Sequence, residues 1–76
     1  MNKQRRKRLE EASALLEQAQ AILEEVKDEE AEAYENLPEG LQGSERGDAM
    51  QEAIDNLESA YDGLEDVISS IEEAGA

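Results

Sequence analysis

Apolar residues recur at helical spacing in two long segments of the chain. In the first segment they step by three and four residues in the order Leu9, Ala12, Leu16, Ala19, Leu23 and Val26. Leu15 and Ile22 widen this stripe on one flank. Three apolar positions per heptad exceed the need of a two-stranded coiled coil and are typical of a helix bundle. The pattern predicts a helix over residues 3–36.

The second segment keeps the same spacing without a break. Its stripe is Met50, Ala53, Leu57, Ala60, Leu64, Val67, Ile71 and Ala74, flanked by Ile54, Tyr61 and Ile68. This predicts a helix over residues 44–74. Gly63 lies beside the stripe and costs a helix up to about 1 kcal/mol relative to alanine, so we expect another backbone to approach it closely. Gly75 is expected to end the helix.

The segment between the two helices is predicted to be a connector over residues 37–43. Pro38 disfavours helical geometry at Leu37, and Gly40 and Gly43 allow the chain to reverse. Leu37 and Leu41 are expected either to turn inward and close the end of the bundle or to form a recognition tip.

The start of the second helix has two candidate caps. Ser44 is a suitable N-cap, and Asp48 followed by Gln51 is a second possibility of the capping-box type.

These elements predict an all-α fold, a single domain over residues 1–76 built as a two-helix antiparallel hairpin. A chain of 76 residues buries little core, and it has neither cysteine nor histidine to supply a disulfide or a Cys/His zinc site. We therefore expect two copies to dimerise into a four-helix bundle. The residues predicted to form the dimer stripe are Leu16, Leu23, Ile54, Leu57, Tyr61, Leu64 and Ile68.

Charge is distributed unevenly along the chain, whose net charge is −14. Residues 1–8 hold a basic arm without any acid, and from Leu9 onward 21 acidic residues face only Lys27 and Arg46, a net charge of −19. The basic arm would either neutralise phosphates or fold back beside acids of the second helix. The acidic body would repel nucleic acid and anionic membranes and favour basic partners. The basic arm consists of Lys3, Arg5, Arg6, Lys7 and Arg8.

The end of the first helix carries acids where the helix dipole favours cations. Such a broken local rule can mark function. The stripe also sends Glu30 inward, where Arg46 is a candidate partner. We predict a partner-binding site formed by this acidic patch and the connector: Asp28, Glu29, Glu32, Glu35, Leu37, Leu41 and Arg46.

Two carboxylate pairs, Glu29 with Glu32 and Glu52 with Asp55, resemble the Glu-x-x-Glu and Glu-x-x-Asp pairs of the all-α nucleoside triphosphate pyrophosphatases. That resemblance implies Mg²⁺ binding, which clustered oxygens favour. On the stripe count, however, Glu32, Glu52 and Asp55 project to outer faces. This enzyme is therefore a remote alternative, and no catalytic, metal or cofactor residue is predicted.

The connector Asn-Leu-Pro-Glu-Gly-Leu-Gln-x-Ser-Glu-Arg-Gly, residues 36–47, resembles small acidic helical proteins of phages, prophages and other mobile elements. The resemblance implies a context and no particular activity. With the acidic surface, it favours a non-enzymatic protein-binding module, an accessory or inhibitor protein that engages a basic or nucleic-acid-handling partner and imitates nucleic acid. The alternative is a structural oligomerisation or adaptor module. No apolar run is long enough to span a membrane, so we expect the chain to act in the cytoplasm.

Overall fold

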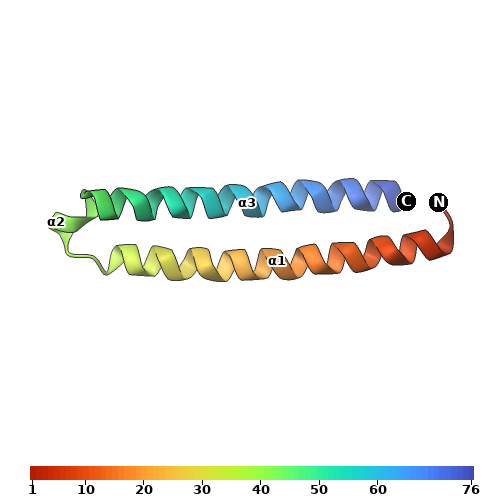
Figure 1. Cartoon of the computed structure of the whole chain (residues 1–76), viewed down its shortest axis with the longest axis horizontal. Helices are drawn as coiled ribbons and strands as arrows, with labels where there is room; N and C mark the ends of the chain where they lie inside the picture. The colour runs from red at the N-terminus through yellow and green to blue at the C-terminus, as the bar shows by residue number, and fades with distance from the viewer.

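The computed structural model describes residues 1–76 as two long antiparallel helices joined by a short one (Figure 1). Helix α1 spans Lys3–Glu35, α2 spans Glu39–Gln42, and α3 spans Glu45–Gly75. The predicted all-α hairpin is confirmed, and the long helices begin and end within one residue of the predicted bounds. The two termini lie at the same end of the hairpin (Figure 1). The connector is more ordered than predicted, because it contains α2.

The hairpin is long and thin, with extents of 59 × 15 × 12 Å and a radius of gyration of 17.3 Å. A globular domain of this length has a radius of gyration of about 11 Å. The accessible surface is 5719 Å², whereas a compact monomer of 8.4 kDa exposes about 4,600 Å². Only three residues are buried, namely Gln20, Gly47 and Ile68. One copy of the hairpin therefore encloses very little core.

Side-chain caps fix the N-termini of both long helices. The Asn2 side chain accepts a hydrogen bond from the Arg5 amide at 2.8 Å. The Ser44 hydroxyl accepts one from the Gly47 amide at 3.4 Å, which satisfies one of the free amides of the first turn. Ser44 is thus confirmed as the N-cap of α3. The Asp48 alternative is wrong, because that residue lies inside the first turn.

Gln42 ties the connector to the end of α1. Its Nε2 donates to the carbonyl oxygens of Tyr34 at 3.5 Å and Leu37 at 3.4 Å. Leu37 is half-buried, but Leu41 is exposed. The expectation that both leucines turn inward is therefore wrong for Leu41, because α2 turns its side chain toward solvent.

Gly47 is the glycine at which backbones approach closely. A Cβ atom there would lie 2.0 Å from the carbonyl oxygen of Gln42 and 2.8 Å from that of Leu41. No side chain fits at that separation, so only glycine allows α3 to start against α2. At Gly63 a Cβ atom would meet nothing within 4 Å. The predicted close approach at Gly63 is therefore absent within one chain.

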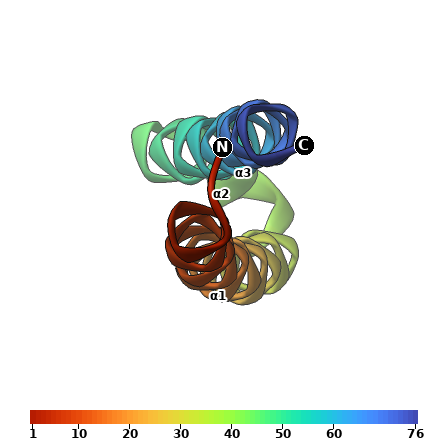
Figure 2. The same cartoon turned by 90° about the vertical axis from the view of Figure 1, so that its right-hand side faces the viewer.

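The contact between α1 and α3 runs the length of the hairpin, and seen along the helix axes the two helices stack at a shallow crossing (Figure 2). The least exposed positions recur at steps of four and three in both helices. We call these positions the seam. In α1 the seam is Leu9, Ser13, Leu16, Gln20, Leu23, Lys27, Glu30 and Tyr34; in α3 it is Met50, Ile54, Leu57, Tyr61, Leu64, Ile68, Ile71 and Gly75.

Every second seam position differs from the predicted stripe. In α1, the pattern predicted Val26 to face inward, but Val26 is exposed, and Lys27 is half-buried instead. In α3 the stripe residues Ala60, Val67 and Ala74 are exposed. Their places are taken by the larger flanking residues, because burying Ile54, Tyr61 and Ile68 removes more apolar surface from water than burying alanines.

Candidate interaction surfaces

The seam divides the hairpin into two broad faces. A helix turns by about 100° per residue, so the residue after Leu9 or Leu16 projects to one side of the seam and the residue before Ser13 or Gln20 projects to the other. Because α1 and α3 run antiparallel, the residues after Leu57 and Leu64 project to the same side as those after Leu9 and Leu16. Each broad face is therefore built from both helices.

One of these faces is acidic. We define the acidic face as the acids of α1 and α3 that project beyond the same side of the seam. Among them, the exposed Glu65 is held by a hydrogen bond of 2.8 Å from Gln20 Nε2 to its Oε2. The acidic face consists of Glu10, Glu17, Glu24, Asp28, Glu35, Asp48, Asp55, Glu58, Asp62, Glu65 and Glu72.

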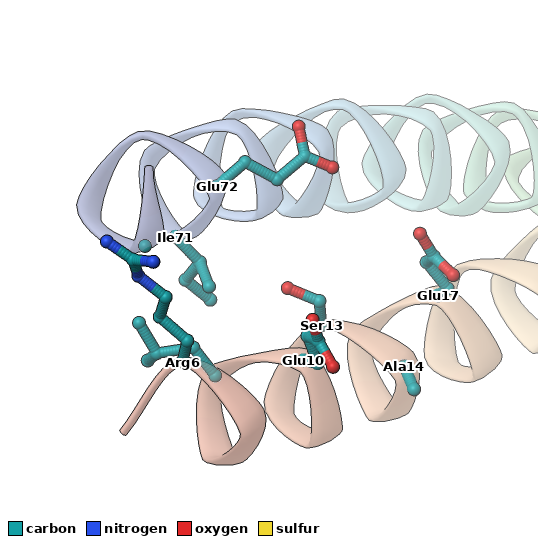
Figure 3. A pocket seen from close by; sticks show the side chains of 9 residues that line it. Arg6, Glu10, Ser13, Ala14, Glu17, Ile71 and Glu72 are labelled. Carbon is teal, nitrogen blue, oxygen red and sulfur yellow. The ribbon is translucent and has the colours of Figure 1, made fainter. Parts of the chain in front are cut away.

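At the open end of the hairpin the acidic face is hollowed into a groove (Figure 3). Glu10 and Glu17 line it from α1, and Glu72 lines it from α3. Arg6 reaches from the first turn of α1 toward the last turn of α3 (Figure 3). The groove is thus a carboxylate-lined surface that one cation of the basic arm closes at its end.

The opposite face is apolar and nearly free of acids. We call it the apolar face. In α1 it exposes Leu15 by 65% and Ile22 by 59% of their surface, and Val26 by 43%. At the open end, one hollow is lined by Leu9 of α1 and by Asp66, Val67, Ser70, Ile71 and Ala74 of α3. Another groups Leu9 with Arg5 and Arg8. The face comprises Ala12, Leu15, Ala19, Ile22 and Val26 of α1 and Ala53, Ala60, Gly63, Val67 and Ala74 of α3.

By the same helical count, Glu29 is the only acid among the residues that project to the apolar face. The cations on this face are Arg5 and Arg8 near the start of α1 and Arg46 at the start of α3. The remaining acids of the long helices, apart from Glu30, lie on the outer edges of the hairpin. Acids are thus segregated to one face and the edges, a division that the total charge does not reveal.

The four acids of the predicted patch do not share a face. All four are exposed. Asp28 and Glu35 belong to the acidic face, Glu32 to the outer edge of α1, and Glu29 to the apolar face. Consecutive acids along a helix point in different directions, and so a cluster in sequence is spread around the helix. The sequence pattern alone did not single out the other acids of the acidic face, such as Glu17, which can be found by counting from the seam.

Glu30 lies on the seam and is half-buried, in agreement with the inward position that the pattern predicted. Arg46 is exposed in the first turn of α3, and no hydrogen bond joins it to Glu30. With Leu37 half-buried and Leu41 exposed, the connector end offers an arginine and a leucine to solvent.

The residues predicted as the dimer stripe all pack between α1 and α3 of one chain. Ile68 is buried, and the others are half-buried. The apolar residues most exposed to solvent are instead those that widened the stripe, Leu15 and Ile22.

The basic arm forms the first two turns of α1 and is exposed. Folding of the hairpin brings it beside the end of α3, where Arg6 shares the groove with Glu72. Lys3 and Lys7 project toward the acidic side of the seam, and Arg5 and Arg8 project toward the apolar side. The arm therefore contributes charge to both faces at the open end.

The carboxylates of the pyrophosphatase-like pattern are spread apart. Glu29 and Asp55 lie on opposite faces, and Glu32 and Glu52 lie on the outer edges of different helices. No group of three or more carboxylates is arranged to hold a metal ion.

Comparisons of the chain with protein-family models, with curated proteins and with solved structures found no match. Neither of the long helices has a stretch apolar enough to cross a lipid bilayer.

Proposed function

We propose that the chain is a non-enzymatic protein-binding module whose acidic face engages a basic, nucleic-acid-handling protein. The observation that carries this proposal is the alignment of carboxylates from two helices on one side of the seam. On this proposal the face substitutes for a nucleic-acid backbone in the basic groove of the partner. The resemblance of residues 36–47 to small phage proteins favours an accessory or inhibitor role in the cytoplasm.

The geometry suits such a partner because the acids are held on a rigid frame. Residues seven apart on a helix are about 10 Å apart along its axis, so Glu10, Glu17 and Glu24 form a regular row. Asp62, Glu65 and Glu72 supply the neighbouring row on α3. A row of fixed charges raises the association rate with an oppositely charged surface and makes binding sensitive to salt.

The test compares two triple charge reversals with the same net charge. The first variant carries Glu17→Lys, Glu24→Lys and Asp62→Lys on the acidic face. The control carries Glu11→Lys, Glu25→Lys and Glu52→Lys on the outer edges. Each protein is titrated into a panel of nucleases and DNA-binding proteins bound to a fluorescent DNA duplex, and displacement of the duplex is measured by anisotropy.

The wild-type chain and the outer-edge control are expected to displace the duplex from at least one protein of the panel, and the acidic-face variant is not. Circular dichroism checks that all three chains stay helical. If both variants lose displacement of the duplex equally, total charge and not the acidic face causes the displacement. A wild-type chain that displaces the duplex from no protein of the panel would contradict the proposal.

A second candidate function, a structural oligomerisation module, rests on a different observation. The hairpin exposes about 1,100 Å² more surface than a compact monomer of its mass, and its apolar face is uncovered. A homodimer that forms a four-helix bundle would cover that face. Sedimentation equilibrium tests it, and a monomer at every concentration would contradict it.

A further inference from the structure

The apolar face has the size and composition of a subunit interface. The hairpin's two longer extents are 59 and 15 Å, so one broad face projects to about 900 Å², close to the roughly 800 Å² per partner of a standard protein interface. Leu15 and Ile22 stand at its centre and are more than half exposed. A monomeric chain rarely leaves such a contiguous apolar surface in water.

Along this face of α1, aliphatic residues occupy the middle, and residues of opposite charge occupy the two ends. Arg8, Ala12 and Leu15 precede Ala19, and Ile22, Val26 and Glu29 follow it. Steps of three and four separate them, so that aliphatic residues stand symmetrically about Ala19, with a cation at one end and an acid at the other. Such a surface is complementary to itself when a second copy lies antiparallel, as a two-fold axis requires.

We infer that a second copy of the chain covers the apolar face, with the two α1 helices packed antiparallel about a two-fold axis near Ala19. Arg8 of each copy then lies beside Glu29 of the other, and Leu15 packs against Ile22. The contact residues differ from those of the predicted dimer stripe, which the seam uses within each chain.

Charge selects this arrangement over the other two-fold pairing. If the two-fold axis ran parallel to the helices, α1 would lie over α3 of the second copy, and Glu29 would face positions near Asn56 that carry no cation. If the axis runs across the helices, Glu29 of each copy lies beside Arg8 of the other, which gives two ion pairs. Ion pairs at an interface mainly set orientation and partner choice. Since Glu29 is the only acid that the helical count projects to this face, it is the residue that fixes the register.

The α3 helices meet in the same arrangement. Gln20 donates a hydrogen bond to the Tyr61 carbonyl, and Leu9 Cδ1 lies 3.6 Å from the position that a Cβ atom would take at Gly75. Both observations place Ala19 near the level of residues 62–66. An axis at that level brings Gly63 of one copy opposite Val67 of the other. Gly63 has open space around it within the chain, and a neighbouring helix can use that space for close packing. The absence of a side chain at Gly63 is unfavourable in an isolated helix, but it allows the α3 helices of the two copies to pack closely.

A cysteine at the symmetry axis gives the first test, because the chain has no other thiol. In the variant Ala19→Cys, the two thiols of a dimer come within disulfide range, which requires Cα atoms about 4.4–6.8 Å apart. Ala21→Cys on the opposite side of α1 is the matched control. Under mild oxidation, a non-reducing gel should show Ala19→Cys as a covalent dimer and Ala21→Cys as a monomer. Equal cross-linking of both variants, or none in a sample that sediments as a dimer, would overturn the inference.

A charge swap gives the second test. Arg8→Glu and Glu29→Arg should each raise the dimer dissociation constant by about tenfold, because each single change creates two like-charge pairs. The double variant should return to within about threefold of the wild type. Independent effects without rescue would overturn the register, and a wild type that sediments as a monomer would overturn the dimer. Neither result bears on the acidic face, whose residues are unchanged in these variants.

Discussion

Gln20 of α1 donates a hydrogen bond from Nε2 to the carbonyl oxygen of Tyr61 in α3, 3.2 Å away. The same nitrogen donates to Glu65, and Gln20 is 6% exposed. It is the most deeply buried polar side chain of the seam, and it fixes which turn of α3 lies opposite it. A polar residue at a seam position costs stability and selects one register of pairing.

Replacing Gln20 by leucine should therefore raise stability. The Tyr61 carbonyl is already used in the hydrogen-bond ladder of α3, and the exposed Glu65 carboxylate can bind water, so neither group is left without a partner. We expect Gln20→Leu to raise the free energy of unfolding by about 1 kcal/mol and Gln20→Ala to lower it by about 1 kcal/mol. Urea unfolding followed by circular dichroism measures both. If the leucine variant had as low a free energy of unfolding as the alanine variant, the hydrogen bonds of Gln20 would contribute more to stability than the apolar burial that leucine gains.

Gly47 should tolerate no larger residue. The Cβ of alanine would press against the backbone oxygens of Gln42 and Leu41, and backbone atoms cannot move aside as a flexible side chain can. We expect Gly47→Ala to lower the free energy of unfolding by about 2 kcal/mol, despite the better helix propensity of alanine. Gly40→Ala is the control, since nothing lies within 4 Å of its Cβ position, and it should be neutral or slightly stabilising. Similar losses in both variants would contradict the packing argument.

The sequence was sufficient to predict the helices because their signals are local. Pro38 and Ser44 marked the ends of the connector, and the three–four spacing of apolar residues continued over many turns. The close packing at Gly47 could not be predicted in this way, since it depends on how α2 folds against α3.

The seam was predicted only in part because the apolar stripe is wider than one contact surface. Leu16 and Leu23 belong to the seam on either count, but Ala19 and Gln20 compete for the position between them. Hydrophobicity favours the alanine, and the volume of the facing α3 residues together with the hydrogen bonds of Gln20 decides the outcome. The faces follow from the seam, so the acidic face could not be assigned before the hairpin was known.

Ser44 should contribute about 1 kcal/mol as the N-cap of α3, because its hydroxyl accepts from the Gly47 amide. We expect Ser44→Ala to lower the free energy of unfolding by that amount. Ser69→Ala, on the exposed surface of α3, makes the same chemical change within the helix and should be neutral or slightly stabilising. Thermal melts at one protein concentration compare the two. Equal effects would show that the cap contributes nothing.

Salt should stabilise the hairpin. The net charge is −14, acids crowd one face, and neither long helix has a basic residue in its last turn, so repulsion opposes folding. Raising sodium chloride from about 0.01 M to about 1 M shortens the Debye length from about 30 to about 3 Å. We expect the melting temperature to rise by about 5 °C, which corresponds to about 1 kcal/mol for a domain of this size.

The matched variant for the salt experiment removes charge from the acidic face without reversing it. With Glu17→Gln, Glu24→Gln and Asp62→Asn, the chain should melt at a higher temperature than the wild type in dilute salt, and it should gain less from added salt. The isosteric changes leave side-chain size and the seam unaltered, so the difference reports repulsion alone. A melting temperature that falls with salt in the wild type would show that attraction between the basic arm and the end of α3 outweighs repulsion across the acidic face.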